Sequence, residues 1–405
     1  MKPLERSSRL DSIDLLRGLV MVVMALDHVK GNFWKGGFEP LDLADSHANA
    51  FVFLTRWVTH YCAPTFVLLA GTGAFLFGAR RQSKGQLAWF LFSRGLWLVI
   101  LELTVIRYSW FLELKYQFAF GQVIWVIGLS MMAMSAMIFL SLSAIVTFGL
   151  ALIGLHNAFD GVRAAEFGDY DWVWKILHTG ESITINSDVL HLRKAEFSPF
   201  YPLIPWIGVV AAGYGLGGIM TLEPSRRRRE LLGLGLTLIV TFFVLRYWNF
   251  YGDKPAMRPG LPGPWSKQST TLFTIFSFVN CQKYPPSLCF LLMTLGPAIT
   301  ALALFEYVPA NIGKPLVILG RVPMFFYLLH WYLIKGLAIL IAYLRFGRFD
   351  WLYGEPRAEH GPPDNGFDLW VVYLIWLSVV VLLFPLCSWY AGVKRRSKSV
   401  WLSYL

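Results

Sequence analysis

Long apolar runs, each near the ~20 residues that cross a bilayer as a helix, alternate along the chain with polar or basic segments. We predict about ten transmembrane helices, with cores at Leu15–Phe33, Arg56–Gly78, Leu87–Ile106, Phe118–Met137, Ile138–Leu155, Phe200–Met220, Leu231–Trp248, Pro286–Phe305, Pro323–Leu344 and Leu369–Tyr390. The apolar stretch from Phe118 to Leu155 is too long for one crossing. We divide it near Ser141, which predicts a tight turn between two helices.

Basic residues favour an even number of helices over an odd one. They cluster at Lys2/Arg6/Arg9, Arg80/Arg81/Lys84, Arg226-Arg227-Arg228-Arg229 and Lys394/Arg395/Arg396/Lys398. An even number places all four clusters on one side, and positive residues in short loops mark the cytoplasm. We therefore expect both termini in the cytoplasm. The longer connections then form a substrate vestibule on the other side, and they are His156–Ser198, Asn249–Tyr284, Arg345–Phe367 and the shorter Trp34–Asn49.

Composition agrees with this pattern. The chain has 405 residues, of which 56% are hydrophobic and only 15% charged, whereas soluble domains carry about 25% charge. We predict an all-α fold, a polytopic integral membrane helix bundle with a single domain over residues 1–405. The net charge of +11 then indicates the inner membrane face, not nucleic acid. The first apolar run lacks a small-residue cleavage site, which favours a retained helix over a signal peptide.

The first helix carries three ionisable residues where a membrane span has few. Arg17, Asp27 and His28 lie in an otherwise apolar run, and such residues persist in membranes mainly where they face protein or water. Arg17 and His28 are eleven residues apart, close to three helical turns, so both lie on one face, ~16 Å apart along the axis. The alternative is that Arg17 reaches lipid head groups and His28 caps the far end of the helix.

The second helix adds two more polar candidates. Arg56 and His60 are four residues apart and share a face, and Pro64 frees a backbone carbonyl one turn before it. His60 and His28 are expected at similar depths below the outer surface, where the two imidazoles could converge. The alternative role of His60 is a packing hydrogen bond. We expect Ala70, Gly71 and Gly73 to serve close helix packing rather than substrate contact.

Later helices supply the remaining candidates. Arg94 is expected in the cytoplasmic half of the third helix, where a phosphate can reach it. Arg321 enters the ninth helix, and His330 and Trp331 follow near mid-membrane. For His330 the alternative is an aromatic packing element.

These residue types favour acyl transfer. A neutral imidazole can take a proton from a hydroxyl or amine that attacks an activated carbonyl. Arginine suits the phosphates of an acyl carrier. The sequence has no Gly-rich phosphate loop, paired metal-ligand motif or Ser–His–Asp signature, and its four cysteines are scattered. We therefore expect no metal and favour acyl transfer across the bilayer over redox or hydrolytic metal chemistry.

The same residues carry a resemblance to known membrane enzymes. Leu10-Asp11-Ser12-Ile13-Asp14-Leu15-Leu16-Arg17-Gly18-Leu19 followed by His28 resembles the first-helix pattern of the acyltransferase family 3 membrane proteins. Further motifs are closer to another branch: Ser12-Ile13-Asp14-Leu15-Leu16-Arg17-Gly18, Ala63-Pro64-Thr65-Phe66-Val67, Tyr201-Pro202-Leu203-Ile204-Pro205-Trp206-Ile207-Gly208 and Phe325-Phe326-Tyr327-Leu328-Leu329-His330-Trp331. Through them nearly the whole chain is similar to bacterial relatives of the heparan-α-glucosaminide N-acetyltransferase catalytic domain.

The resemblance implies a transmembrane acyltransferase of about ten or eleven helices in a bacterial inner membrane. Relatives transfer an acyl group, commonly acetyl from acetyl-CoA at the cytosolic face, to an acceptor on the opposite side, often a sugar. By the family 3 pattern, Arg17 is a donor-binding cation and His28 the catalytic histidine. The heparan branch instead places its crucial histidine after the first helix, so that His47 or His60 is its counterpart here.

Our leading hypothesis is an acyltransferase that uses cytosolic acetyl-CoA as co-substrate and acetylates a hydroxyl or amine of an extracytoplasmic glycan or glycolipid. The proposed roles are as follows: His28 is the general base, oriented by Asp27 or His60; Arg17, Arg94 and Arg321 hold the donor; His47, Arg56, His330 and Trp331 contact the acceptor. The rivals are a proton-coupled secondary transporter and a polytopic scaffold with paired buried charges. The transporter lacks support from inverted repeats. Homo-oligomerisation is left open.

Overall fold

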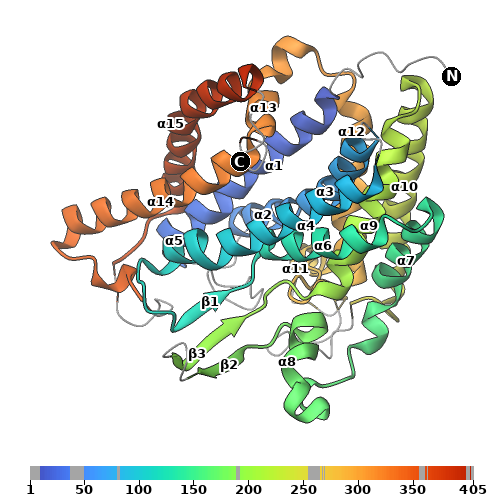
Figure 1. Ribbon diagram of the computed structural model, residues 1–405. Coiled ribbons are helices and arrows are strands. Elements are labelled where there is room, and N and C mark those ends of the chain that lie inside the picture. The colour runs from blue at the N-terminus through green and yellow to red at the C-terminus, as the bar shows by residue number, and fades with distance from the viewer. Residues whose placement is uncertain are drawn as a thin grey trace.

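The computed structural model describes residues 10–36, 50–79, 83–187, 192–253, 265–266, 268, 270–354, 361–362, 364–397 and 402 (Figure 1). The helices that build the bundle are α1 (Asp11–Phe33), α2 (Ala50–Thr59), α3 (Cys62–Gly78), α4 (Lys84–Leu101), α6 (Val123–Met137), α7 (Leu142–Leu155), α9 (Leu203–Met220), α10 (Pro224–Trp248), α12 (Leu288–Phe305), α14 (Pro323–Phe346) and α15 (Leu369–Arg396). The shorter elements are α5 (Arg107–Phe111), β1 (Phe118–Phe120), α8 (Asp171–Trp174), β2 (Ile183–Ser187), β3 (Leu192–Ser198), α11 (Thr271–Val279) and α13 (Ala310–Arg321).

Eight helical runs in the described chain are long and apolar enough to cross a membrane. In three of these runs short elements continue the span: α2 precedes α3, a π-helical turn (Glu102–Ile106) and α5 follow α4, and a 3-10 turn (His156–Phe159) follows α7. Two further helices belong to the bundle: α1, whose charged residues lower its hydropathy, and the 15-residue α6. Within the described residues the bundle thus contains eight helical runs that could cross a membrane and two further helices, which confirms a polytopic helical membrane bundle.

The division of the long apolar stretch near Ser141 is confirmed. Helix α6 ends at Met137, and α7 begins after Ser141, whose hydroxyl accepts a hydrogen bond from the backbone N–H of Ala144 at 3.2 Å. This is an ordinary N-cap, which satisfies one of the donors that a helix start leaves open.

The predicted start of the fourth helix at Phe118 is wrong. Residues Phe118–Phe120 form β1 and pair in parallel with Glu196–Ser198 of β3, and the helix starts only at Val123. The third strand, β2, is antiparallel to β3, so the sheet order is β1-β3-β2. The partner strand lies far away in sequence, and an apolar run does not distinguish a short buried strand from a helix.

The bundle has two chemically different ends. At the end that we call the basic end, Lys84 donates to the carbonyl of Phe139 at 3.3 Å, and Arg227 pairs with Glu306 at 2.5 Å. Arg321 pairs there with Asp11, close to the start of α1, at 3.1 Å. The opposite end, which we call the sheet end, carries β1, β2, β3 and α8 (Figure 1). The turns that hold the described basic clusters thus share one end.

Glycines allow two helix pairs to approach closely. A Cβ atom at Gly320 of α13 would lie 1.8 Å from the carbonyl oxygen of Asp14 in α1, so no other residue fits there without movement. Between α3 and α9, a Cβ at Gly71 would lie 2.0 Å from the carbonyl oxygen of Val210. Gly71 therefore serves helix packing as predicted, and the α1–α13 contact brings Arg321 beside Asp14.

Candidate active site

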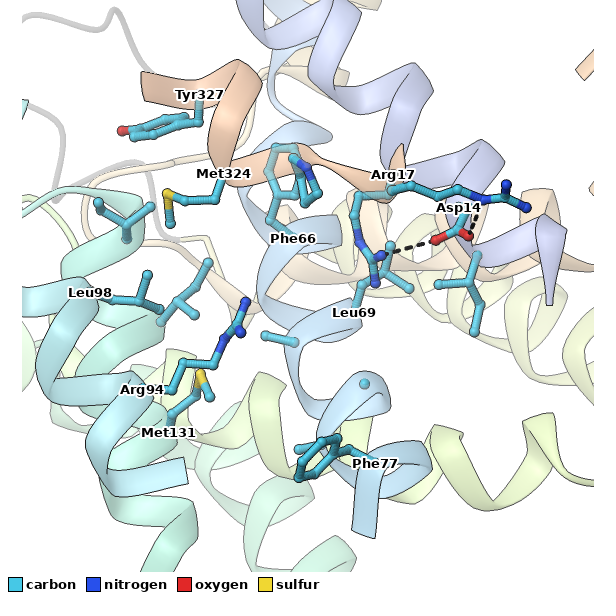
Figure 2. A pocket seen from close by; sticks show the side chains of 18 of the residues that line it. Asp14, Arg17, Phe66, Leu69, Phe77, Arg94, Leu98, Met131, Met324 and Tyr327 are labelled. Atoms are coloured by element: carbon cyan, nitrogen blue, oxygen red, sulfur yellow. Dashed lines mark hydrogen bonds and ion pairs between the residues drawn. The ribbon is translucent and has the colours of Figure 1, made fainter. Parts of the chain in front are cut away.

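A cavity of about 490 Å³ lies inside the bundle toward the basic end. Its walls come from α1, α3, α4, α6 and α14, together with the ends of α13 and α15. Most of its lining is apolar, and four methionines contribute to it: Met21, Met24, Met131 and Met324. Figure 2 shows the cavity with α1 on one side and α4 on the other. Apolar walls with a few converging polar groups are typical of ligand sites.

The polar groups in this cavity are mainly cationic. Arg17, Arg94, Arg321 and Lys394 line it together with a single described carboxylate, Asp14. Figure 2 shows Arg17 and Arg94 extending toward the cavity from opposite walls. The three arginines predicted to hold a donor therefore come together, and Lys394 was not among the candidates.

Two of these arginines are held by neighbouring groups. Arg17 donates to Asp14 Oδ1 and to the carbonyl oxygen of Gly320, both at 3.2 Å. Arg321 is the last residue of α13 instead of the first of the next helix, and it lies 3.5 Å from Asp14 Oδ2. The guanidinium of Arg94 lies 5.9 Å from the ring centre of Phe90. Asp14 thus contacts two of the cations that line the cavity.

A pair of histidines lies about one helical turn beyond the deep end of the cavity. Met24 and Tyr327 line the cavity, and His28 and His330 follow them by four and three residues on α1 and α14. Nδ1 of His28 and Nε2 of His330 are 2.6 Å apart. His28 and His330 are 302 residues apart in sequence, and α1 and α14 bring their imidazoles into a direct hydrogen bond.

The partners of His330 determine the tautomers of the pair. Its Nδ1 faces the carbonyl oxygen of Tyr327 at 2.6 Å, and a carbonyl can only accept, so Nδ1 carries the proton. In a neutral His330, Nε2 is then an acceptor, and Nδ1 of His28 must donate to it. This leaves the lone pair of a neutral His28 on Nε2, to which no described residue makes a hydrogen bond.

Trp331 fixes the plane of the His28 ring. The ring centres of His28 and Trp331 are 4.2 Å apart and stacked, and the ring centre of Trp110 lies 4.2 Å from that of Trp331. Trp331 is 1% exposed and His330 is fully buried. His28 is thus positioned by one hydrogen bond, to His330, and by stacking contacts with His330 and Trp331, all from α14.

Asp27 and Arg56 form a separate buried group beside His28. Arg56 donates to Asp27 Oδ1 at 2.6 Å, and the hydroxyl of Thr59 lies 3.1 Å from the same oxygen. Both charged side chains are less than a fifth exposed. The structure therefore gives Asp27 a partner in the second predicted helix, while the ring of His28 is hydrogen-bonded to His330.

The other predicted histidines lie elsewhere. His60 is buried at the junction of α2 and α3, edge-on to the ring of Phe290 at 5.6 Å. His47 lies outside the described residues.

Between the Asp27–Arg56 pair and the sheet end lie residues that were not predicted from the sequence. Tyr201 and Tyr284 lie within electrostatic reach of Arg56, and their hydroxyls are 3.5 Å apart. Burial raises the pKa of Tyr201 well above its usual range, so its hydroxyl stays neutral. Lys283 lies within electrostatic reach of both Asp27 and His28. The available signal was Lys283-Tyr284 directly before two prolines at a helix start.

Comparison with known families identifies a match over more than half of the chain. The sequence matches the family described as heparan-alpha-glucosaminide N-acetyltransferase, catalytic, over residues 9–245. The chain belongs to this family. The resemblance found in the sequence is thereby confirmed, and the protein is an integral membrane protein of an acetyltransferase family. The match includes Arg17, His28 and Arg94 but ends before His330 and Trp331. None of the curated proteins that were compared with the sequence matches it.

Proposed function

We propose that this protein transfers an acetyl group from acetyl-CoA at the basic end to an amine or hydroxyl of a glycan or glycolipid at the sheet end. The basic end would face the cytoplasm of a bacterial cell, because positive residues in short loops mark that side. The observation that carries the proposal is the His28–His330 pair, which lies beyond the deep end of a cavity lined by arginines.

The cavity suits a coenzyme A thioester in charge and in length. Arg17, Arg94 and Arg321 would bind the phosphates, for which guanidinium groups provide several charge-assisted donors. The pantetheine arm, with its two amide groups, is comparable to about four extended residues, or ~14 Å. Arg17 and His28 lie ~16 Å apart along α1. A donor anchored at the arginines would therefore present its thioester near His28.

His28 would act as the general base. Its Nε2 would take a proton from the acceptor amine while the amine nitrogen attacks the thioester carbon. When the carbon–sulfur bond breaks, the imidazolium would return the proton to the leaving thiolate, which yields coenzyme A and the acetylated acceptor. His330 would stabilise the imidazolium through the hydrogen bond to Nδ1. Asp27 and Arg56 would support the acceptor side of the same site, together with Trp331.

The family description suggests the chemistry of the acceptor, which we place at the sheet end. The family name specifies an α-glucosaminide and acetylation at nitrogen, so the amine of a terminal glucosamine is the first candidate. Family membership favours this transfer over the proton-coupled transporter, which would need no cationic donor cavity.

The test is acetyl transfer by the purified protein. The wild-type protein is incubated with radiolabelled acetyl-CoA and glucosamine, and label is followed into the sugar; His28→Asn is the matched variant because it keeps size and polarity. We expect transfer by the wild type and a loss of ~10²–10⁴-fold in His28→Asn with donor binding retained. Equal rates would show that His28 is not the base, and label in no member of a glycan panel would contradict the transferase.

A further inference from the structure

Helix α15 runs antiparallel to α1, from the sheet end to the basic end (Figure 1). Just before α15 begins, the backbone N–H of Phe367 donates to the carbonyl oxygen of Phe33, the last residue of α1, at 2.7 Å. Further along, the indole N–H of Trp376 donates to the carbonyl oxygen of Val22 at 2.8 Å. The contacts with α1 thus move toward the start of α1 as α15 proceeds.

The last turn of α15 carries Lys394, which lines the cavity. Lys394 follows Trp376 by 18 residues, which is ~27 Å along a helix. Arg17 is only five residues, or ~8 Å, from Val22, the residue of α1 that contacts Trp376. Lys394 therefore lies closer to the basic end than Arg17.

The end of α15 directs one basic residue to the cavity and exposes its neighbours. Tyr390 stacks on Phe325 of α14 with the ring centres 4.2 Å apart, and this buried contact fixes the rotation of the helix one turn before Lys394. Lys394 is partly buried, whereas the following Arg395 and Arg396 are exposed. The fold therefore separates a cavity lysine from two solvent-facing arginines.

The cations of the cavity are divided between two depths. Arg17 and Arg94 extend toward the cavity from opposite walls (Figure 2), at the depth proposed for the diphosphate. Arg321, which pairs with Asp11 in the first turn of α1 at 3.1 Å, lies nearer the basic end, as does Lys394. Coenzyme A also carries its phosphates in two places, a diphosphate beside the pantetheine arm and a monophosphate on the 3′ oxygen of the ribose. The outer cations thus suit the second phosphate.

We propose that Lys394 binds the 3′-phosphate of the donor and thereby selects coenzyme A thioesters over their 3′-dephospho counterparts. The proposal rests on the proposed acetyl transfer and adds a specificity-determining residue to its donor site. A phosphate monoester carries ~1.5–2 negative charges at pH 7, and an ammonium group binds it as a compact charge with three donors. Lys394 lies outside the residues that the family match covers, 9–245, so family membership does not assign this contact.

The test is a binding cycle with two ligands that differ by one phosphate, coenzyme A and 3′-dephospho-coenzyme A. Dissociation constants are measured by calorimetry without acceptor, at constant ionic strength. The variants are Lys394→Ala and the charge-conserving Lys394→Arg. The control is Arg395→Ala, which removes an exposed cation from the same helical turn and reports the effect of net charge alone.

We expect the wild type to bind coenzyme A ~10–100-fold more tightly than the dephospho form, because hydrogen bonds between charged groups contribute that much. Lys394→Ala should lose this difference through weaker binding of coenzyme A alone, while Lys394→Arg and Arg395→Ala should keep it. Equal binding of the two ligands by the wild type would overturn the proposal. An equal loss for both ligands in Lys394→Ala would also overturn it, and would indicate a lipid head group as the partner of Lys394.

The binding cycle separates this proposal from the proposed reaction, because no acetyl group is transferred in it. A phosphate preference that depends on Lys394 supports the contact even where labelled acetyl reaches no acceptor, in which case the proposed reaction alone fails. Acetyl transfer with the same KM for acetyl-CoA and its 3′-dephospho form refutes the role of Lys394 alone.

Discussion

The Nδ1 of His28 and the Nε2 of His330 lie 2.6 Å apart. Because the Nδ1 of His330 faces a backbone carbonyl, its proton position is fixed, and that position in turn fixes the proton of a neutral His28. One imidazole thereby keeps its neighbour in the tautomer that a base needs, with the lone pair on Nε2. In this account His330 is a positioning residue that acts through His28.

The first prediction concerns this positioning. His330→Leu removes the acceptor for His28 Nδ1 and should lower kcat by ~10-fold or more, since an unmet buried hydrogen bond costs ~1–3 kcal/mol. The KM for acetyl-CoA should stay within about twofold of the wild-type value. His330→Gln offers an amide oxygen as acceptor and should recover part of kcat. If His330 had only a structural role, His330→Leu and His330→Gln would lose thermal stability and activity to the same extent.

The second prediction concerns donor charge. Arg94→Gln should raise the KM for acetyl-CoA by ~10-fold, because one charge-assisted phosphate contact is lost. The control is Arg226→Gln, whose side chain lies at the same end but is 65% exposed outside the cavity. If the two variants give the same KM, the cavity is not the donor site.

The third prediction concerns a larger side chain at Gly73 that would fill part of the cavity. A Cβ atom at Gly73, which lines the cavity, meets no other atom within 4 Å. Gly73→Leu should therefore fold normally and yet block the donor, which appears as weaker acetyl-CoA binding in a direct binding assay. Gly233→Leu is the matched control, since Gly233 is also unobstructed but lies exposed on α10. Unchanged binding in Gly73→Leu would exclude the cavity as donor site.

The fourth prediction concerns the ion pair of Asp27 and Arg56. Removing one partner leaves an uncompensated charge, which costs ~3–5 kcal/mol for a buried pair. Asp27→Asn and Arg56→Gln should each lower the midpoint of thermal unfolding. The double variant should lose less thermal stability than the two single variants together, because it leaves no charge unpaired. Additive losses would mean that the two side chains are not coupled.

Features that depend on spacing along one helix could be predicted from the sequence. The spacing of Arg17 and His28 on one face predicted a helix with a cation near its start and an imidazole deeper in the bundle. The division of the long apolar stretch near Ser141 and the packing role of Gly71 also follow from local rules. The three arginines were predicted one by one as donor-binding residues, and the fold brings them to one cavity.

The remaining features depend on contacts between distant segments. The bond between His28 and His330 joins α1 to α14, and no local pattern specifies which helices become neighbours. Strand β1 pairs with a segment far along the chain, so its apolar residues read as part of a helix. Lys283 follows Gln282 in a loop whose backbone is held by the buried ion pair of Arg246 and Asp253, and this contact is not visible in the local sequence.

The central claim is that an acetyl group passes from a donor at the basic end, through the site of His28, to an acceptor at the sheet end. It is tested most directly in sealed proteoliposomes, with radiolabelled acetyl-CoA outside and glucosamine trapped inside. Protein molecules inserted with the basic end outward should label the trapped sugar, while His28→Asn in matched vesicles should not. Labelling only when donor and acceptor are on the same side, or equal labelling by His28→Asn, would contradict the account.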